Sequence, residues 1–472
     1  MPEPTFQLYN TMSRAVEPLA PLHPPKVTLY VCGPTIYDYA HIGNFRTYVA
    51  VDLLRRALKH FGYQVDHVMQ FTDVDDKTIK GARAKNLPLK DYTAVFGKAF
   101  LEDAKTLNIE TPERTPNATD FIPSMVALIQ KLIDKKAAYV SDDGSVYFRI
   151  ASFPKYGCLC HLDLAGMISG ARVNQDEYEK EGVGDFVLWK KWVEADGDVG
   201  WDSPWGRGRP GWHIECSALS MEHLGPQIDI HGGGVDLRFP HHENEIAQSE
   251  AATGLPFVRH WFHVEHLLVD GQKMSKSLGN MYTIRDVLQR GFTGRELRYA
   301  LISGAAYAKN LNFTWQGMED AKTALARIDE WRKRLLDRVT SAQPQGVITV
   351  STASEEDLTE MLDDALSEDL NISAALGFLF LWIRTTHKKM DEGTLTMEEA
   401  STYLKVWDKL DAVLGLGDAT VSIPPEVQKL LDDRAAARKG KDFAKSDELR
   451  KAIEALGWKV KDTAKGQEVT KA

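Results

Sequence analysis

The chain has 472 residues, of which 43% are hydrophobic and 26% are charged, ordinary proportions for a soluble globular protein. One hydrophobic core does not extend over such a length, so we expect several domains. The net charge of −10 does not itself favour a nucleic-acid partner, and the longest apolar run is about half of a membrane span. Four cysteines in so long a chain, with no signal-peptide pattern at the start, predict a cytoplasmic protein that has no membrane partner.

The first predicted elements form a strand–helix–strand unit. Residues 27–32 are typical of a short buried strand, a helix is expected over about 43–60, and a second strand over 65–72. This order predicts a parallel sheet that binds its ligands at the carboxyl ends of its strands. Cys32 and His41 fall at or near that edge of the predicted sheet.

The remainder of the chain divides by its residue patterns. Residues 121–205 contain helical stretches and a hairpin pattern with Asp143-Gly144 at its turn, which indicates an insertion. We expect the sheet to resume over 227–230 and again near 262–269. Beyond Trp315 the apolar spacing becomes helical. The last 49 residues carry 12 basic and 9 acidic side chains, a local positive excess.

Two polar residues mark the start of the first predicted helix, within the string His41-Ile42-Gly43-Asn44. A helix N-terminus presents free N–H groups and partial positive charge, which attract phosphate oxygens. His41 and Asn44 lie three positions apart, so both could point at one anion. Polar residues that only cap the helix would look the same, and this string alone leaves both interpretations open.

A more specific string, Lys273-Met274-Ser275-Lys276-Ser277, follows about 230 residues later. Nucleotidyl transfer depends on positioning and on cations that meet the developing negative charge. Lys273 and Lys276 on a mobile loop could close on a nucleoside triphosphate and then release pyrophosphate. The alternative interpretation is a solvated basic turn. The helix-start motif upstream favours the nucleotide-binding interpretation over it.

In combination, these two motifs resemble those of class I aminoacyl-tRNA synthetases. Longer strings, which occur in the expected order over residues 30–280, narrow the resemblance to the cysteinyl-tRNA synthetase family. They are YVCGPTIYD, FTDVDDK, GRPGWHIECSA, DIHGGGVDLRFPHHENEIAQS and KMSKSLGN. The resemblance extends through ARKGKDFAKSDELR near the end and covers nearly the whole chain.

The resemblance implies an α/β protein with a Rossmann-like parallel-sheet catalytic domain, an insertion, a helical bundle and a small C-terminal anticodon-binding domain. The implied boundaries are 1–120 and 206–262 for the two halves of the catalytic domain, 121–205 for the connective insertion, 263–320 for the stem-contact region that carries the lysine loop, 321–415 for the helical bundle that binds tRNA, and 424–472 for the anticodon-recognition domain.

The residues also point to a metal site without reference to any family. Cys32 ends the first predicted strand, Cys216 follows a Trp-His-Ile-Glu segment, and His241 and Glu245 share a helix face four positions apart. Two cysteines, a histidine and a glutamate form a reasonable Zn²⁺ ligand set. From spacing alone, His242 with Glu245 or His213 with Cys216 would fit equally well.

The resemblance implies the set Cys32, Cys216, His241 and Glu245, with one Zn²⁺ ion per chain. A metal-bound thiol is deprotonated, whereas a serine hydroxyl is a harder and far less acidic ligand. Discrimination of about 10⁴-fold corresponds to about 5.5 kcal/mol, which an apolar pocket cannot provide between near-isosteres. A soft metal can supply much of it, so we expect L-cysteine as the substrate and no editing domain.

Other roles also follow from the resemblance. His41, Asn44, Lys273 and Lys276 are expected to be catalytic. ATP, accompanied by Mg²⁺, is expected to contact His41, Asn44, His231, Gly232, Gly233, Gly234, Asp236 and Lys276, in part because Gly residues let a backbone approach a ligand closely. Cysteine is expected at Gly33, Thr72 and Trp212, although a core position suits a Trp almost as well.

Two further groups have ambiguous roles. Asp73, Asp75 and Asp76 either order the substrate amine or a Mg²⁺ ion, or form a solvated acidic loop. Cys158 and Cys160 have a CxC spacing that suits a metal, but they fall outside the ligand pattern of the family. We interpret these two cysteines as ordinary reduced thiols.

The expected activity is ATP-dependent ligation of L-cysteine to tRNA(Cys) through a cysteinyl-adenylate, by a monomer. The usual family motif at the helix start ends in His, and Asn44 departs from it; Asn donates a hydrogen bond but carries no charge. A ligase that joins cysteine to an amino sugar is one alternative, against which the roughly 150 residues after Asp320 argue. A catalytically silent RNA- or nucleotide-binding relative, suggested only by Asn44, is another.

Overall fold

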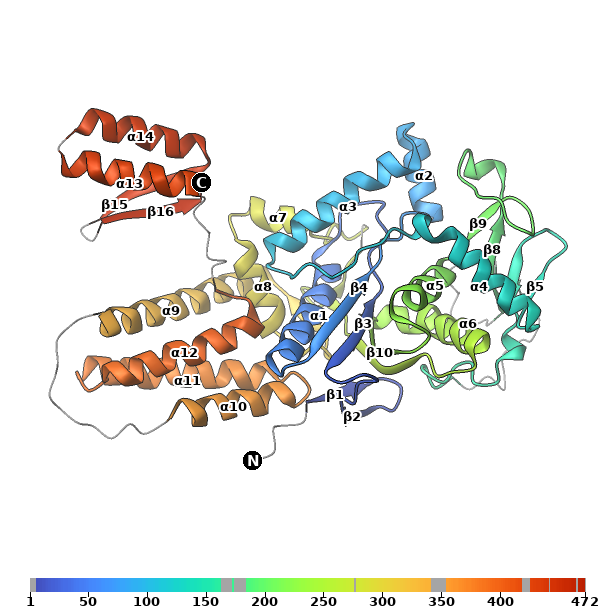
Figure 1. Ribbon diagram of the computed structural model, residues 1–472, viewed down its shortest axis with the longest axis horizontal. Coiled ribbons are helices and arrows are strands. Elements are labelled where there is room, and N and C mark those ends of the chain that lie inside the picture. The colour runs from blue at the N-terminus through green and yellow to red at the C-terminus, as the bar shows by residue number, and fades with distance from the viewer. Residues whose placement is uncertain are drawn as a thin grey trace. The chain divides into compact units, whose positions relative to one another are not determined.

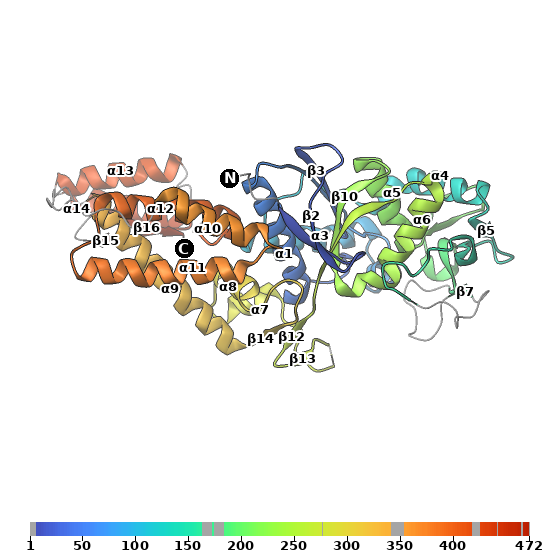
Figure 2. The same ribbon diagram turned by 90° about the horizontal axis from the view of Figure 1, so that it is seen from below.

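We describe a computed structural model of the chain over residues 6–162, 172–173, 184–275, 277–340, 354–417, 425–440, 442–463 and 466–471. The chain forms two compact units, Met1–Gly415 and Leu416–Ala472. Figures 1 and 2 show the elements of each unit from two directions. No helix among the described residues is both long and apolar enough to cross a membrane.

A four-stranded parallel sheet forms the centre of the first unit, with the strand order β11-β10-β3-β4. Its strands are β3 (Lys26–Val31), β4 (Gln64–Met69), β10 (Ile228–Gly234) and β11 (Val258–Val264). Helix α1 (Ile42–His60) links β3 to β4 and buries Phe45, Val49, Leu53 and Ala57, which recur every four residues on one face. The predicted strand–helix–strand unit and its parallel pairing are therefore confirmed.

Two sequence expectations about this sheet were inaccurate. The strand expected over 227–230 continues through the glycines to Gly234, so His231 and the three glycines lie in β10 and do not form a turn. The segment near 262–269 belongs to two sheets, because β11 ends at Val264 and β12 (Leu267–Val269) pairs with other strands. An apolar run with a short interruption does not reveal such a change of partner.

The insertion has a sheet of its own. It contains α4 (Ile122–Asp134) and the strands β5 (Ala138–Val140), β6 (Val146–Phe148), β7 (Arg172–Val173), β8 (Asp185–Lys191) and β9 (Gly208–Pro210). Strands β5 and β6 form the predicted antiparallel hairpin, and Gly144 at its turn has a φ of +86°, which favours glycine. Helices α5 (Trp212–Leu224) and α6 (Glu243–Thr253) then return the chain to the parallel sheet and pack against each other.

Lys273, the first residue of the lysine loop, lies in a small separate sheet with the order β13-β12-β14. Strand β13 is Gln272–Lys273, and β14 is Leu311–Phe313. Helices α7 (Ile284–Gln289) and α8 (Gly294–Ser303) lie between β13 and β14 in the sequence. The first unit also contains β1 (Gln7–Asn10), β2 (Ala15–Pro18), α2 (Asp76–Lys85) and α3 (Leu89–Thr106).

Four helices complete the first unit: α9 (Trp315–Thr340), α10 (Glu355–Ser367), α11 (Ile372–Asp391) and α12 (Met397–Leu414). Figure 2 shows them side by side. A buried ion pair joins this bundle to α1, because the Arg298 guanidinium of α8 lies 2.6 Å from Asp52 of α1 and also donates to the Leu414 carbonyl at the end of α12. Arg298 and Asp52 have no exposed side-chain surface.

The second unit is a small α/β module. It contains α13 (Pro425–Lys439), α14 (Phe443–Ala455) and an antiparallel pair formed by β15 (Trp458–Thr463) and β16 (Gly466–Lys471). Its own hydrophobic core includes Leu431, Ile453 and Trp458. The buried Arg434 guanidinium pairs with Asp462 at 2.9 Å and ties α13 to the strand pair.

Candidate active site

Helix α1 begins where the sequence predicted a phosphate cradle. His41 is its N-cap: His41 Nδ1 accepts from the Asn44 backbone N–H at 3.2 Å, while Asn44 Oδ1 accepts from the His41 backbone N–H at 3.0 Å. This reciprocal pair is a capping box. Burial lowers the pKa of the His41 imidazole, and the nearby Asp236 carboxylate opposes that shift. Asn44 therefore caps the helix, one of the two roles that the sequence left open, and it does so through its side-chain oxygen.

The lysine loop lies against this helix start. A Cβ atom on Gly43 would come within 2.3 Å of the Met274 methyl group, so the loop packs directly on the helix start and the Met274 side chain would have to move for a larger residue. The Ile42 N–H donates to the Tyr282 carbonyl at 2.8 Å, a few residues beyond the loop. Lys273 is exposed in β13, whereas Lys276 lies outside the described residues. Two motifs about 230 residues apart in the sequence thus meet at one edge of the sheet.

The four predicted metal ligands converge behind this edge. The ligand atoms of Cys32, Cys216, His241 and Glu245 all lie within 4.8 Å of one another. The Cys32 and Cys216 sulfurs are 3.6 Å apart, and His241 Nε2 is 3.3 Å from the Cys216 sulfur and 3.1 Å from Glu245 Oε1. Cys216, His241 and Glu245 are 0% exposed. We call these four residues the metal group.

Local structure explains how the metal group assembles. Cys32 directly follows β3, at the carboxyl edge of the sheet, and Cys216 faces it from the second turn of α5. His241 lies in the segment Arg238–His242 that precedes α6, two residues after a kink at the non-helical Phe239. Glu245 follows in the first turn of α6, so the four-residue spacing places it beside His241.

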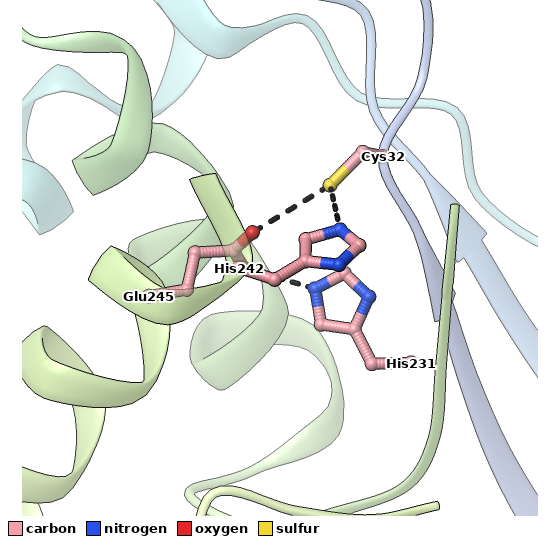
Figure 3. A group of neighbouring side chains, drawn as sticks. All are labelled: Cys32, His231, His242 and Glu245. Carbon is pink, nitrogen blue, oxygen red and sulfur yellow. Dashed lines mark hydrogen bonds and ion pairs between the residues drawn. The ribbon is translucent and has the colours of Figure 1, made fainter. Parts of the chain in front are cut away.

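A second set of four residues overlaps the metal group. Cys32, His231, His242 and Glu245 also have ligand atoms within 4.8 Å of one another, and Figure 3 shows them facing a shared centre. His242 Nε2 is 3.5 Å from the Cys32 sulfur, and His231 Nε2 is 2.9 Å from Glu245 Oε2. The alternative of His242 with Glu245 therefore stays open geometrically. His213 falls in neither set; its Nδ1 is 2.8 Å from His241 Nδ1, on the side away from the sulfurs.

The electrostatics of this pocket favour a bound cation. Burial, and then the neighbouring Cys216 and Glu245, raise the pKa of the Cys32 thiol well above its usual range. Thiolates and a carboxylate cannot all ionise in one buried space unless a cation compensates them. Burial also lowers the pKa of His241 to about 3, so its imidazole is neutral at physiological pH, as a metal ligand must be.

The residues predicted to bind the amino acid surround the metal group. Trp212 opens α5, and its ring lies 4.2 Å from the His241 ring. Gly33 follows Cys32, and a Cβ on it would collide with the Gln70 carbonyl oxygen at 1.5 Å. Thr72 is fully buried, and its hydroxyl donates to Glu215 Oε2 at 3.0 Å.

The residues predicted to bind ATP separate into two places. Gly232, Gly233 and Gly234 form the end of β10, and Asp236 follows them close to α1. The His231 imidazole, which was grouped with them, is 0% exposed and contacts Glu245 and the Trp261 ring. Strand alternation places His231 and Gly233 on one face of β10, where a Cβ on Gly233 would lie 2.9 Å from His242 Cε1, and Gly232 and Gly234 on the other face.

The acidic loop and the CxC pair have partners within the protein. Asp75 caps α2, Asp76 pairs with Lys190 at 3.0 Å and with Arg209, and Asp73 accepts from the Thr119 backbone N–H and hydroxyl. Cys158 and Cys160 lie against Glu243 and in neither metal set, and burial raises the pKa of both thiols to about 12. Both thiols are therefore protonated at neutral pH, in line with the interpretation of ordinary reduced cysteines.

Sequence reasoning missed several residues that support this site. Gln70 donates to the Cys216 sulfur at 3.0 Å and accepts from the Tyr30 hydroxyl at 2.8 Å. His263 lies 2.8 Å from His242, and its other ring nitrogen lies 2.8 Å from the Thr11 hydroxyl. Gln70 and His263 lie on or just after sheet strands, where an isolated polar residue looks like an ordinary buried side chain. No spacing rule would have identified them.

Comparisons with known proteins agree with the fold and with the arrangement of the site. The family model of the class I (C) tRNA synthetase catalytic domain matches residues 18–323, and that of the cysteinyl-tRNA ligase anticodon-binding domain matches residues 420–469. A solved structure of Mycobacterium tuberculosis methionyl-tRNA synthetase shares the fold, with a TM-score of 0.65 and 14% identity over 89% of this chain and 96% of that one. The molecule thus has the architecture of a class I aminoacyl-tRNA synthetase.

Two curated relatives show which family of class I aminoacyl-tRNA synthetases the chain is similar to. The cysteine–tRNA ligase of Protochlamydia amoebophila (strain UWE25) is 48% identical and covers 99% of this chain and 98% of its own length. That of Chlamydia felis (strain Fe/C-56) is also 48% identical, over 98% of this chain and 97% of its own length. The chain belongs to the cysteine–tRNA ligase family.

Proposed function

We propose that this chain activates L-cysteine with ATP and transfers it to tRNA(Cys). The cysteine carboxylate attacks the α-phosphorus of ATP and pyrophosphate leaves; a ribose hydroxyl at the 3′ end of the tRNA then attacks the cysteinyl-adenylate and AMP leaves. Two observations carry the proposal: the four residues of the metal group lie together, and the helix start contacts the segment that follows the lysine loop. Both steps require mainly that reactants and charges be positioned.

Zn²⁺ fits the metal group because two thiol sulfurs, an imidazole and a carboxylate are a ligand set of this borderline-soft ion. When bound, Zn²⁺ would supply a Lewis acid that takes the substrate thiol as its thiolate and binds a serine hydroxyl poorly. Cys32, Cys216, His241 and Glu245 would hold the ion. The second set shares Cys32 and Glu245, and replaces Cys216 and His241 by His231 and His242.

The chain's own side chains would act around this ion. Trp212 and the Gly33 backbone would border the amino acid, while Thr72, oriented by Glu215, would hold it in place. His41, whose pKa is lowered by burial, would meet the triphosphate as a neutral donor at the start of α1.

The remaining contacts with ATP involve charge and close approach. Lys273 and Lys276 would neutralise the leaving pyrophosphate, and Mg²⁺ would accompany the triphosphate. The glycines at the end of β10 would admit the adenosine, with Asp236 as the acceptor for its ribose hydroxyls. The N–H groups at the start of α1, together with Asn44, would face the phosphates.

The test of this function is cysteine-dependent exchange of radioactive pyrophosphate into ATP, with serine as the control amino acid. We expect exchange with cysteine to exceed that with serine by about 10⁴-fold if the metal supplies about 5.5 kcal/mol of discrimination. Equal exchange with both amino acids, or purified protein without zinc by elemental analysis, would contradict the proposal.

The second unit and the bundle are proposed to bind the tRNA, and the protein to act as a cytoplasmic monomer. Removal of all residues after Gly415, the boundary between the two units, should leave exchange within about twofold while aminoacylation of tRNA(Cys) falls by at least about tenfold. Full aminoacylation by the shortened chain would refute the role of the second unit. An amino-sugar ligase is disfavoured, because residues 420–469 match an anticodon-binding domain and such a ligase has no tRNA substrate.

A further inference from the structure

A group of aromatic side chains beside the lysine loop has no part in the chemistry described so far. Arg290, Phe292, Trp315, Gln316 and Glu319 line a surface hollow of about 340 Å³, which we call the aromatic pocket. Its volume is at the lower end of the roughly 300–1,000 Å³ typical of ligand pockets. Phe292 and Trp315 are half-buried with nearly parallel rings, whose centroids are 6.1 Å apart.

Arg290 gives the aromatic pocket a cation. Its guanidinium carbon lies 3.9 Å from the centre of the Trp315 ring and 5.6 Å from that of Tyr282. The side chain is exposed, and it forms no ion pair with any residue that the structure describes. Stacking on an aromatic ring holds a guanidinium in place while its N–H groups remain available to an anion.

The aromatic pocket is built on the framework that carries the activation site. Tyr282, whose ring contacts Trp315 edge-on at 5.0 Å, uses its carbonyl to accept the Ile42 N–H at the start of α1. On the other side, Trp315 begins α9, and one residue separates it from β14; β14 pairs with β12, and β12 also pairs with Lys273 in β13. A ligand in the aromatic pocket would therefore be connected by short backbone paths to both motifs of the activation site.

We propose that the aromatic pocket binds one unpaired nucleotide of the tRNA. Aromatic rings stack on nucleobases whatever their identity, and an exposed guanidinium meets a phosphate. The Gln316 amide and the Glu319 carboxylate offer hydrogen bonds to a base edge, and a carboxylate accepts from an exocyclic amine. An apolar peptide side chain would engage the rings but would leave the Arg290 cation and the Glu319 carboxylate without a role.

This inference rests on the proposed function, because it assigns a place on the chain to the RNA substrate of that reaction. It makes a separate claim, since neither the metal group nor the lysine loop takes part in the contact. The two claims therefore fail in different assays: pyrophosphate exchange needs no tRNA, whereas the aromatic pocket should affect only steps that involve tRNA.

The test compares Trp315→Ala with the wild-type full-length chain. We expect the KM for tRNA(Cys) in aminoacylation, and the Kd for the tRNA, to rise by roughly 5- to 100-fold, the range of a single lost base stack. The rate of pyrophosphate exchange should stay within about twofold. Trp315→Phe, which retains a ring, should recover most of the loss. Leu255→Ala, at an apolar residue between α6 and β11 that is 43% exposed and lies in none of the proposed binding regions, is the matched control and should have no effect.

A second variant covers the case in which Trp315→Ala disturbs folding. Arg290→Ala removes an exposed cation, and the slope of log Kd for the tRNA against log salt concentration should fall by about 0.7, the value of one single-strand phosphate contact. Unchanged Kd and slope in Arg290→Ala, or unchanged charging in Trp315→Ala that retains exchange, would overturn the proposal. If the wild-type protein showed no cysteine-dependent exchange, the proposed function would be refuted instead. The Kd for tRNA, compared between the wild type and the two variants, would still decide whether the aromatic pocket binds RNA.

Discussion

The two ends of the candidate active site are built in opposite ways. The metal group lies behind the sheet with Cys216, His241 and Glu245 at 0% exposure, and Gln70 and His213 hold its members in place. At the other end, Lys273 occupies an exposed two-residue strand, and Leu278 in the same loop is 57% exposed. One end is buried, and the other is open to solvent.

This difference matches two physical tasks. Selection of a sulfur over an oxygen needs ligands whose geometry is fixed before the substrate arrives, because a site that adapts to its ligand discriminates less between close analogues. Release of pyrophosphate needs contacts that form and break in every turnover, and an exposed loop can move without disrupting a core. The contrast predicts that damage at one end should affect selection, and damage at the other end should affect rate.

The largest effect is expected from Cys216→Ser at the buried end. Loss of this ligand should abolish stoichiometric zinc and lower cysteine-dependent exchange by about 10³- to 10⁴-fold, because the ion that would bind the substrate thiolate is no longer held. Metal analysis and pyrophosphate exchange measure the two losses. Cys160→Ser, at a partly buried thiol outside both metal sets, is the matched control and should keep both properties. A Cys216→Ser protein with full zinc and full activity would remove this residue from the mechanism.

Lys276→Ala tests the open end. We expect adenylate formation to slow by about 100-fold or more, because a cation that meets the leaving pyrophosphate is lost. Zinc content and the Kd for cysteine should not change, because Lys276 is neither a member of the metal group nor a proposed contact of the amino acid. Stopped-flow or exchange rates, compared with equilibrium binding of cysteine, give the measurement. An unchanged exchange rate, or a parallel loss of zinc, would contradict the division of tasks.

The buried end should also respond to pH in a defined direction. Burial raises the pKa of the Cys32 thiol, so the metal-free thiol is protonated at neutral pH and must lose its proton when a metal binds. Affinity for Zn²⁺ should therefore rise with pH and fall by at least about tenfold for each unit of acidification below that raised pKa, because Cys32 alone releases one proton when the metal binds. Competition with a chelator between pH 6 and 8, corrected for the titration of the chelator, measures the slope. An affinity that does not depend on pH would show that Cys32 is not a ligand.

The smallest effect is expected at Asn44, where a pair of variants separates capping from phosphate contact. Asn44→Ala removes the side-chain half of the capping box, which should cost about 1 kcal/mol and slow exchange by about fivefold. Asn44→Asp keeps an oxygen for the His41 N–H but adds a negative charge beside the proposed triphosphate. Normal melting temperature with slow exchange in Asn44→Asp would place the side chain at the phosphates; full activity would leave Asn44 with the cap alone.

Much of the fold could be read from local pattern. The strand–helix–strand unit followed from apolar spacing, because β3, α1 and β4 are each contiguous and their crossover geometry is nearly obligatory. The hairpin of the insertion followed from Asp143-Gly144, since a positive φ favours glycine. The end of β10 was misjudged because glycines usually interrupt strands, whereas here they bring the backbone close to His242: a Cβ on Gly233 would lie 2.9 Å from His242 Cε1.

The site was predictable only where its residues are close together in the sequence. His241 and Glu245 lie four apart on one helical segment, so their shared face is a local property. Cys32 and Cys216 are 184 positions apart, and spacing could not choose between His213, His241 and His242 as the imidazole that joins them. The buried partners Gln70 and His263 had no local signal at all.

The sequence by itself determined the family, the order of the elements and the side chains that bring chemistry to the site, because these depend on motifs and on short-range periodicity. Only the tertiary structure decided which of these side chains meet: that two overlapping sets share Cys32 and Glu245, that Met274 packs on Gly43, and that Arg290 stacks on Trp315 beside the helix start. The reason is physical. A ligand set, like a pocket, is defined by distances between segments remote in the chain, and those distances follow from packing, which local pattern does not encode.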